Sequence, residues 1–308
     1  MGETESVETL DAETVDRVMA VWLAGKAAST RRSYGNDLQA WARFEAAASA
    51  EGAVAGLLGG GPQRARERVR LWQDAMGRGG AAPATVNRRV ACLAGLTEVA
   101  RGIGAVGWRL EVPRLATLRL RDPRGPEPEA IRAMMAWARG RPGLAGPRDA
   151  AILFLLYGLA LRRREVVTLD VEHVDIRRPA VAVLGKGRRE REWLVMPLRV
   201  QEAVAEWMVA RGGRDGPLFV TLSRGHRGER LTGKGVGDVV RRAGQAVGVR
   251  ATPHGLRHSA ITVAIRAGHA LPVVQRFSRH RDLRTLQVYF DRIGDDAAEV
   301  ATTVVGSL

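Results

Sequence analysis

The sequence has 308 residues, of which 45% are hydrophobic and 26% are charged, and it contains a single cysteine, Cys92. A chain of this length and composition is expected to form globular domains, and one cysteine excludes an internal disulfide framework and a cysteine-based metal knuckle. Lys and Arg number 48 against 33 Asp and Glu, a formal net charge of +15. This surplus favours a polyanionic partner, nucleic acid before an anionic membrane surface.

No segment of the sequence has the pattern of a membrane-spanning helix or a signal peptide, and MGETES fits the short myristoylation pattern, which arises easily by chance. The first residues, MGETESVETL, are acidic and lack an apolar signal region, and the longest apolar run, AAILFLLYGLAL (150–161), is too short to span a bilayer. A basic amphipathic helix of the kind that lies on membranes is also missing from the pattern. We therefore expect a cytoplasmic, nucleoid-associated protein.

The first half of the chain has helical periodicity. After a tail at 1–10, residues 11–118 are expected to form a helical domain, with Ser29 and Thr30 capping one helix and Thr85 capping another. Between these helices, AVAGLLGGGPQ lacks the Lys and Ser/Thr that end a phosphate-binding loop, so its glycines predict a flexible turn.

A proline-rich stretch separates this domain from the second one. Three prolines and mixed charges in LRDPRGPEPEA predict an exposed linker at 119–128, followed by a second domain at 129–296 and a tail at 297–308. Inside the second domain the period changes from helical to alternating in AVAVLGKGRREREWLVMPL. This segment is predicted to be a β-hairpin with Lys186 at its tip, between two glycines.

Two basic residues in the second domain are unusual in their setting. Arg162 follows a very apolar helix and continues its buried face, a position that is unfavourable unless the guanidinium is paired or meets an anion. Arg163 and Arg164 are expected to be solvated. Lys186 has the position of an ordinary exposed turn residue, but it is one of three lysines in an arginine-rich chain, and a lysine can donate a proton.

The stretch TPHGLRHSAIT gathers His254, Arg257 and His258 in the first turns of a helix that Pro253 is expected to start. Three interpretations compete: a solvated basic face, a zinc site shared by the two imidazoles, and an anion site that moves protons. Gly255 stands where a zinc protease has its glutamate, and a neighbouring guanidinium opposes a metal cation. Arginine and histidine together suit a phosphate, because one holds the anion and the other transfers protons near neutral pH.

The last motif is QRFSRHRDLRTLQVYFDR, in which His280 and Tyr289 are nine residues apart. With ALRRREVVTLD, LGKGRRERE and HGLRHSAIT before it, this ordered set resembles the tyrosine recombinases, the phage integrase family. The resemblance covers about 126–300, and TRRSYGNDL and TVNRR in 11–115 resemble the core-binding domain of that family more loosely.

The resemblance implies a fold, a reaction and a partner. The fold would be mainly α with a small β-hairpin or sheet: a two-domain DNA clamp with a helical core-binding N-domain and an α+β catalytic domain. The reaction would be site-specific cleavage and rejoining of duplex DNA through a covalent 3′-phosphotyrosyl intermediate, with no cofactor, metal or ATP. The partner would be double-stranded DNA with specific core sites, bound by a tetramer, for integration and excision or for dimer resolution.

The resemblance also assigns roles to individual residues. Arg162 and Arg257 would bind the phosphate, and Lys186 would be the general acid. His254 would act as acid and base, and His280 would donate a hydrogen bond to the phosphate. Tyr289 would be the nucleophile. Glu165 would support this set, and His258 would pack beside it. Contacts of the N-domain with DNA are expected from Thr30, Arg31, Tyr34, Asn87 and Arg88.

Two departures from the family pattern lie beside these residues. Leu159-Ala160-Leu161 stands where Thr-Gly-Leu is usual, which is expected to stiffen the end of the helix. Ser278-Arg279 stands where Leu-Gly is usual, which adds charge beside the site.

Two other functions stay open at this point: a type IB topoisomerase-like enzyme, and a DNA-binding accessory protein with a silent catalytic centre.

Overall fold

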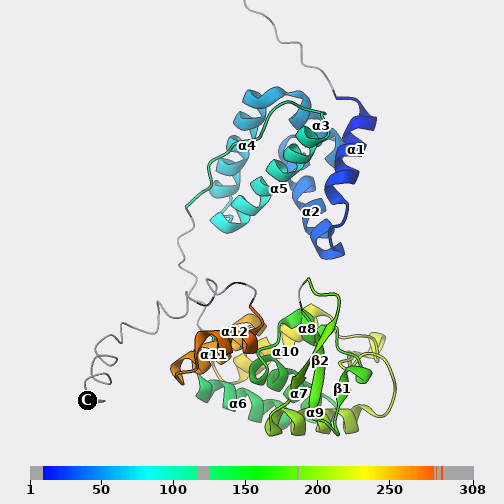
Figure 1. The fold of residues 1–308 in the computed structure, drawn as a ribbon, viewed down its shortest axis with the longest axis vertical. Coiled ribbons are helices and arrows are strands. Elements are labelled where there is room, and N and C mark those ends of the chain that lie inside the picture. The colour runs from blue at the N-terminus through cyan, green and yellow to red at the C-terminus, as the bar shows by residue number, and fades with distance from the viewer. Residues whose placement is uncertain (1–9, 117–124, 186, 281, 283–285, 287–308) are drawn as a thin grey trace, which may run out of the picture. The chain divides into compact units, whose positions relative to one another are not determined.

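The computed structural model describes residues 10–116, 125–185, 187–280, 282 and 286. The chain divides into two compact units, Met1–Leu120 and Arg121–Leu308, which we call the N-terminal and C-terminal units (Figure 1). Lys186, Tyr289 and the tail at 297–308 lie outside the described residues. None of the helices in the described ranges is long and apolar enough to cross a membrane.

The described part of the N-terminal unit is built from helices packed around tryptophan side chains. Trp22, Trp41 and Trp72 are buried, and the rings of Trp41 and Trp72 meet edge to face with centroids 5.1 Å apart. The Trp41 indole also donates a 3.2 Å hydrogen bond to the Ala53 carbonyl, so its polar atom is satisfied inside the core. The helices are α1 (Ala12–Leu23), α2 (Ala28–Phe44), α3 (Ala50–Gly59), α4 (Gly61–Arg78) and α5 (Pro83–Gly102).

The predicted starts of two of these helices are wrong by a few residues. Helix α2 begins at Ala28 and α5 at Pro83, and neither has a side-chain cap, so Ser29, Thr30 and Thr85 lie inside the first turns. Proline suits the first helical position because it has no N–H to satisfy and its φ is already helical. Pro83 therefore favours the start of α5, and α2 begins at Ala28 without a capping side chain.

The glycine-rich stretch at 53–63 is mostly helical, so the predicted flexible turn is wrong except at Gly60 and Gly61. Val54, Leu57 and Leu58 are buried on one face of α3. Burying three such side chains contributes about 1.5–3 kcal/mol each, which exceeds the roughly 1 kcal/mol lost for each glycine in a helix. Gly61 has a φ of 75°, and this left-handed residue turns the chain into α4.

The C-terminal unit combines helices with one small antiparallel sheet, so the expected mainly α fold with a small sheet is confirmed. The predicted hairpin forms between β2 (Ala180–Leu184) and β3 (Arg191–Val195), and β1 (Val174–Asp175) pairs with the other edge of β2. The remaining elements are α6 (Pro128–Arg139), α7 (Ala145–Gly158), α8 (Arg163–Val167), η1 (Val171–His173), α9 (Leu198–Arg211), η2 (Arg224–His226), α10 (Gly233–Ala246), α11 (Pro253–Arg266) and α12 (Leu271–Ser278).

Helix α7 is the centre of the C-terminal unit. Its residues 150–156 are all buried, as expected for a helix that is apolar on every side. It packs against α6, α9 and α11, which carry much of the remaining core of this unit. The end of α7 therefore delivers the chain that follows it to a fixed place beside α11.

The end of the predicted exposed linker is packed rather than exposed. Pro126 is buried, and the Ser259 hydroxyl of α11 donates a 2.6 Å hydrogen bond to its carbonyl. A Cβ at Gly125 would overlap the carbonyl of Gly255, so glycine is required for this close approach. The chain entering the C-terminal unit thus contacts the first turns of α11.

Candidate active site

The sequence suggested that the apolar helix continues to Arg162, but the segment after α7 leaves the helix before that residue. Helix α7 ends at Gly158, and Ala160 adopts a left-handed conformation with a φ of 45°. Such a conformation costs a residue with a Cβ about 1 kcal/mol. The turn makes Arg162 the N-cap of α8, with its side chain 29% exposed, and leaves Arg163 and Arg164 exposed as expected.

Glu165 holds Arg162 in this turn. Its carboxylate accepts a 2.7 Å hydrogen bond from Arg162 Nη1 and a 2.8 Å bond from the Arg162 main-chain N–H. Glu165 is 2% exposed, and a third contact of 3.1 Å comes from Arg279 Nη2. Burial raises the pKa of Glu165, but the charge of Arg279 and the hydrogen bonds and charge of Arg162 outweigh it and hold the pKa below its ordinary value.

Replacing Glu165 by Gln is expected to lower the free energy of unfolding of the C-terminal unit by about 3 kcal/mol at pH 7, because buried cations then lose their counter-charge. The contribution of the ionised carboxylate is present above the unfolded pKa of roughly 4.3. It is lost as pH falls through the lower folded pKa. Hydrogen exchange of peptides from α7 and α8 in urea measures both effects.

The matched control is Glu129, which forms an ion pair with Arg132 at the same sequence spacing and the same 2.7 Å distance as the pair of Glu165 with Arg162. Both partners of this control pair are more than two-thirds exposed. Glu129→Gln should therefore change stability by less than about 0.5 kcal/mol. Equal effects of the two substitutions would contradict a structural role for the buried pair.

Helix α11 carries Arg257 into the middle of the site. The Thr252 hydroxyl accepts a 2.9 Å hydrogen bond from Gly255 N–H, and Pro253 occupies the first turn, as predicted. Arg257 is 2% exposed and donates to the carbonyls of Ala160 and Ser278. One buried guanidinium thus joins α11 to the segment after α7 and to the end of α12.

His254 and His258 contact each other at the start of α11. Their Nε2 atoms are 2.8 Å apart and their rings are perpendicular, with His254 exposed and His258 half-buried. Desolvation, followed by the charges of Arg257 and Arg162, lowers the pKa of His254. Among the described residues, a group of three potential metal ligands is found only at Asp170, Glu172 and His173, and it does not include His254 or His258.

His280 follows directly after α12 and lies beside Arg257. Its Nδ1 is 2.8 Å from the Ser278 hydroxyl, and its Nε2 is 3.5 Å from Arg257 Nη2. Gln275 donates a 3.1 Å hydrogen bond to the His280 carbonyl. Burial, together with the charges of Arg257, Arg162, His254 and Arg279, lowers the pKa of His280 to about 4, so the ring is neutral at pH 7.

Sequence reasoning noted Arg279 only as extra charge and missed its place in the site. Its side chain is 6% exposed and pairs with Glu165. Its φ of 55° is left-handed, so the turn that a glycine usually makes is made here by an arginine. Burial lowers the pKa of Arg279 and the Glu165 charge opposes this, so the added charge is compensated inside the protein.

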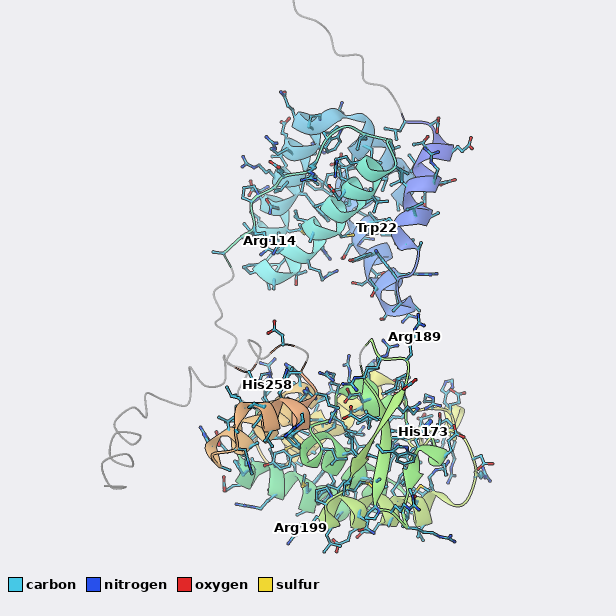
Figure 2. The ribbon with its side chains drawn as sticks, viewed as in Figure 1. Trp22, Arg114, His173, Arg189, Arg199 and His258 are labelled. Carbon is cyan, nitrogen blue, oxygen red and sulfur yellow. The ribbon has the colours of Figure 1, made fainter. Side chains whose placement is uncertain are left out.

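A cavity of about 570 Å³ opens beside this cluster. One wall is the hairpin of β2 and β3, and the other is formed by the end of α12 with Arg162. Figure 2 shows Arg189 of the hairpin and His258 of α11 on one edge of the C-terminal unit, and Arg199 on the opposite edge. The lining residues are Arg162, Gly185, Arg188, Glu192, Gln275, Arg276, Arg279 and His280. A space this rich in guanidinium groups suits a phosphate.

The five candidate DNA contacts of the N-terminal unit lie in the first halves of α2 and α5, two helices that pack together. Arg88 links the two helices through an ion pair with the buried Asp37 and a 3.1 Å hydrogen bond to the Ser33 hydroxyl. Asn87 uses both atoms of its amide on the main chain of Leu115.

The other three candidates lie at the start of α2. Arg31 is exposed, and its Nε donates to the Lys26 carbonyl at 3.0 Å. Thr30 is half-buried, and Tyr34 stacks on Trp22 with ring centroids 4.6 Å apart. Arg31 and Arg88 are the charged members of this set, and both are exposed.

Comparisons with known proteins show the family to which the chain belongs. Residues 127–293 match the model of the phage integrase family. A tyrosine recombinase of Synechococcus elongatus is 35% identical over 281 residues, which cover 88% of this chain and 87% of that protein. The tyrosine recombinase XerC of Mycobacterium bovis is 32% identical over 286 residues, with 86% and 88% covered.

Solved structures share the fold. The Tn1549 transposon integrase in complex with transposon right end DNA matches with a TM-score of 0.70 and 16% identity, over 95% of this chain and 99% of that one. A lambda integrase dimer bound to a COC′ core site matches with a TM-score of 0.66 and 14% identity, over 90% and 94%. From its sequence and fold, the chain belongs to the phage integrase family and is a tyrosine recombinase, an enzyme of site-specific DNA recombination.

Proposed function

We propose that this recombinase cleaves and rejoins duplex DNA through a covalent bond between Tyr289 and a 3′ phosphate, with no metal, ATP or other cofactor. One observation carries the proposal. Arg162 and His280 come from separate segments of the chain and line a single cavity, and the buried Arg257, from a third segment, lies against His280. The segment that continues from His280 leads to Tyr289 nine residues later, within the phage integrase match.

The arginines stabilise the charge that develops on the phosphate. Displacing an oxygen from a phosphodiester builds negative charge on the non-bridging oxygens, and preorganised guanidinium donors stabilise it without having to reorganise. Arg162 and Arg257 take this role. His280 takes the role of a hydrogen-bond donor to a phosphate oxygen. Before DNA binds, the Ser278 hydroxyl donates to the Gln275 carbonyl and accepts from His280 Nδ1–H, while Nε2 faces Arg257, so donation from Nε2 follows a change of tautomer when the phosphate enters.

Tyr289 and Lys186 carry out the transfer itself. The Tyr289 oxygen attacks phosphorus, its proton passes to the neutral His254, and the bond from phosphorus to the 5′ oxygen breaks. Lys186 protonates the departing 5′ oxygen. Attack by another 5′ hydroxyl reverses these steps and rejoins the DNA, so the energy of the phosphodiester bond is conserved.

In this proposal both units bind DNA. Residues 11–118 act as the core-binding domain and residues 129–296 as the catalytic domain, joined by the linker at 119–128. The two domains close on the duplex as a clamp. Thr30, Arg31, Tyr34, Asn87 and Arg88 mark the face of the first domain. Because Asn87 already bonds Leu115, it would order this face or exchange partners when DNA binds. The protein would act in the cytoplasm, at the nucleoid.

A plasmid assay separates recombination from the two other functions. With a supercoiled plasmid that carries two copies of the chain's own site, we expect recombinant circles in EDTA, and with a plasmid lacking the site we expect no relaxation. Relaxation of the site-free plasmid would indicate the type IB topoisomerase-like activity instead. Binding of the site without any strand joining would indicate a silent accessory protein.

The tail at 297–308 links subunits into a recombining tetramer in this proposal. An apolar cavity of about 380 Å³ lies between α7, α11 and α12, and its lining includes Tyr157, Val263, Val274 and Phe277. The tail sequence AAEVATTVVGSL carries valines at nearly helical spacing and is an apolar match for such a cavity.

Deleting 297–308 is therefore expected to abolish recombination between two sites while leaving the affinity for a single site unchanged within about threefold. Val273→Asp should have the same effect, because Val273 is 43% exposed and lines the cavity. Val209→Asp is the control, since Val209 is 83% exposed on α9 and lies outside the cavity lining. Full recombination by the shortened chain would contradict tail-mediated assembly.

A further inference from the structure

We propose that Arg279 is a positioning residue for DNA cleavage: its buried guanidinium ties the segment after α7 to the end of α12 through Glu165 and so fixes the direction of Arg162. This inference rests on the proposed function, because it concerns the same phosphate site. It adds to the catalytic set a residue that acts on the phosphate only through another side chain.

The hydrogen bonds of Arg279 span two segments far apart in the sequence. Nη1 donates to the carbonyls of Leu159 at 3.2 Å and Phe277 at 2.9 Å. Nη2 donates to the carbonyl of Ala160 at 3.1 Å and to Glu165 Oε2 at 3.1 Å. These four bonds use all four Nη hydrogens of the guanidinium, so both Nη atoms of Arg279 are committed within the protein, and the buried Nε–H is the one donor without a bond among the described residues.

Arg162 depends on Arg279 in two ways. Its Nη2 donates a 2.7 Å hydrogen bond to the main-chain carbonyl of Arg279, and its Nη1 donates to Glu165, the carboxylate that Arg279 also holds. Bonds among the described residues use two of the five N–H groups of the Arg162 side chain, which leaves donors that can meet a phosphate in the cavity.

The backbone conformations of the turns at Ala160 and Arg279 also link the two segments. Ala160 and Arg279 are both left-handed non-glycine residues, and they face each other across the site through the bond from Arg279 Nη2 to the Ala160 carbonyl. The same carbonyl accepts a hydrogen bond from Arg257. An unfavourable backbone conformation persists only where its surroundings fix it, and here the Arg279 side chain supplies bonds that fix both turns.

Two variants test the role of the side chain. Arg279→Gly removes the guanidinium but relieves the left-handed backbone, so the chain keeps its turn. Arg279→Lys keeps the charge opposite Glu165 but cannot make four directed bonds. We expect both variants to lower the single-turnover cleavage rate at saturating DNA by about 10- to 100-fold, as expected for a misplaced catalytic group, with the Kd for DNA changed less than about threefold.

The decisive readout is a double-mutant cycle with Arg162. If Arg279 acts through Arg162, Arg279→Gly should lower cleavage by less than about threefold in an Arg162→Ala background, although it lowers wild-type cleavage 10- to 100-fold. A general loss of structure would instead multiply the two effects. Arg199→Ala is the charge-matched control, since Arg199 is exposed on the opposite edge of the unit and should leave the rate unchanged.

The outcomes separate this inference from the proposed function. Wild-type cleavage that requires Tyr289 tests the proposed function and is measured first in the same experiment. Once the wild type is shown to cleave DNA, two results would overturn the positioning role of Arg279. One is a double variant whose loss of cleavage rate equals the product of the two single losses. The other is a wild-type cleavage rate for Arg279→Gly. A loss confined to the Arg162-containing background would support it.

Discussion

Replacing Arg257 by Ala is expected to lower the single-turnover rate of DNA cleavage by about 100- to 1000-fold, the range seen when one preorganised donor to a developing oxyanion is removed. Arg257 is buried and bonds the carbonyls of Ala160 and Ser278, so its guanidinium is fixed before any substrate arrives. Arg257→Lys should also be strongly impaired, because an ammonium cannot replace a planar fork that bonds two segments at once.

The control for this prediction lies on the same helix. Arg266 is in the last turn of α11, its side chain is 53% exposed, and its contact with Glu127 is a surface ion pair at 3.6 Å. Arg266→Ala should keep the wild-type cleavage rate and stability within about 0.5 kcal/mol. A cleavage rate within tenfold of wild type for a folded Arg257→Ala variant would exclude Arg257 from the phosphate site.

The features that sequence could predict are those with short-range causes. The hairpin at 180–195 follows from alternating apolar residues around a glycine-rich tip. The start of α11 follows from Thr252 as cap and Pro253 in the first turn. Cys92 is buried in α5, as its apolar surroundings indicate.

The features that sequence could not predict depend on tertiary contacts. Helix α3 forms through its glycines because Val54, Leu57 and Leu58 reach the core. Ala160 bends the chain where a continuing helix had been expected, and its carbonyl meets two arginines that are about a hundred residues away in sequence. Long-range partners of this kind leave no local pattern.

Arg279 illustrates this limit most clearly. In sequence it is one more arginine in SRHRD, a stretch of the last motif. Its conformation and its bond to Glu165 across 114 residues become visible only in the fold. Asn87 is a comparable case, since its amide is bound to Leu115 within the N-terminal unit. The roles of Thr30, Arg31, Tyr34 and Arg88 on DNA stay predictions.

Replacing Tyr289 by Phe is expected to abolish strand cleavage, because the phenol oxygen is the atom that bonds to phosphorus in the proposed reaction. The substitution removes one oxygen and keeps the ring, so binding of DNA should change less than about threefold. Binding should weaken steeply with salt in both proteins, since arginine contacts to phosphates release counterions. Loss of binding by Tyr289→Phe would indicate a folding defect instead.

The account is tested most directly by trapping the covalent intermediate. The protein is incubated in EDTA with nicked duplexes drawn from the DNA flanking its own gene, and the mixture is run on a denaturing gel. We predict a protein–DNA adduct with the wild type that is missing with Tyr289→Phe and that maps to a peptide containing Tyr289. An adduct that persists in Tyr289→Phe, or cleavage that requires a divalent metal, would contradict the account.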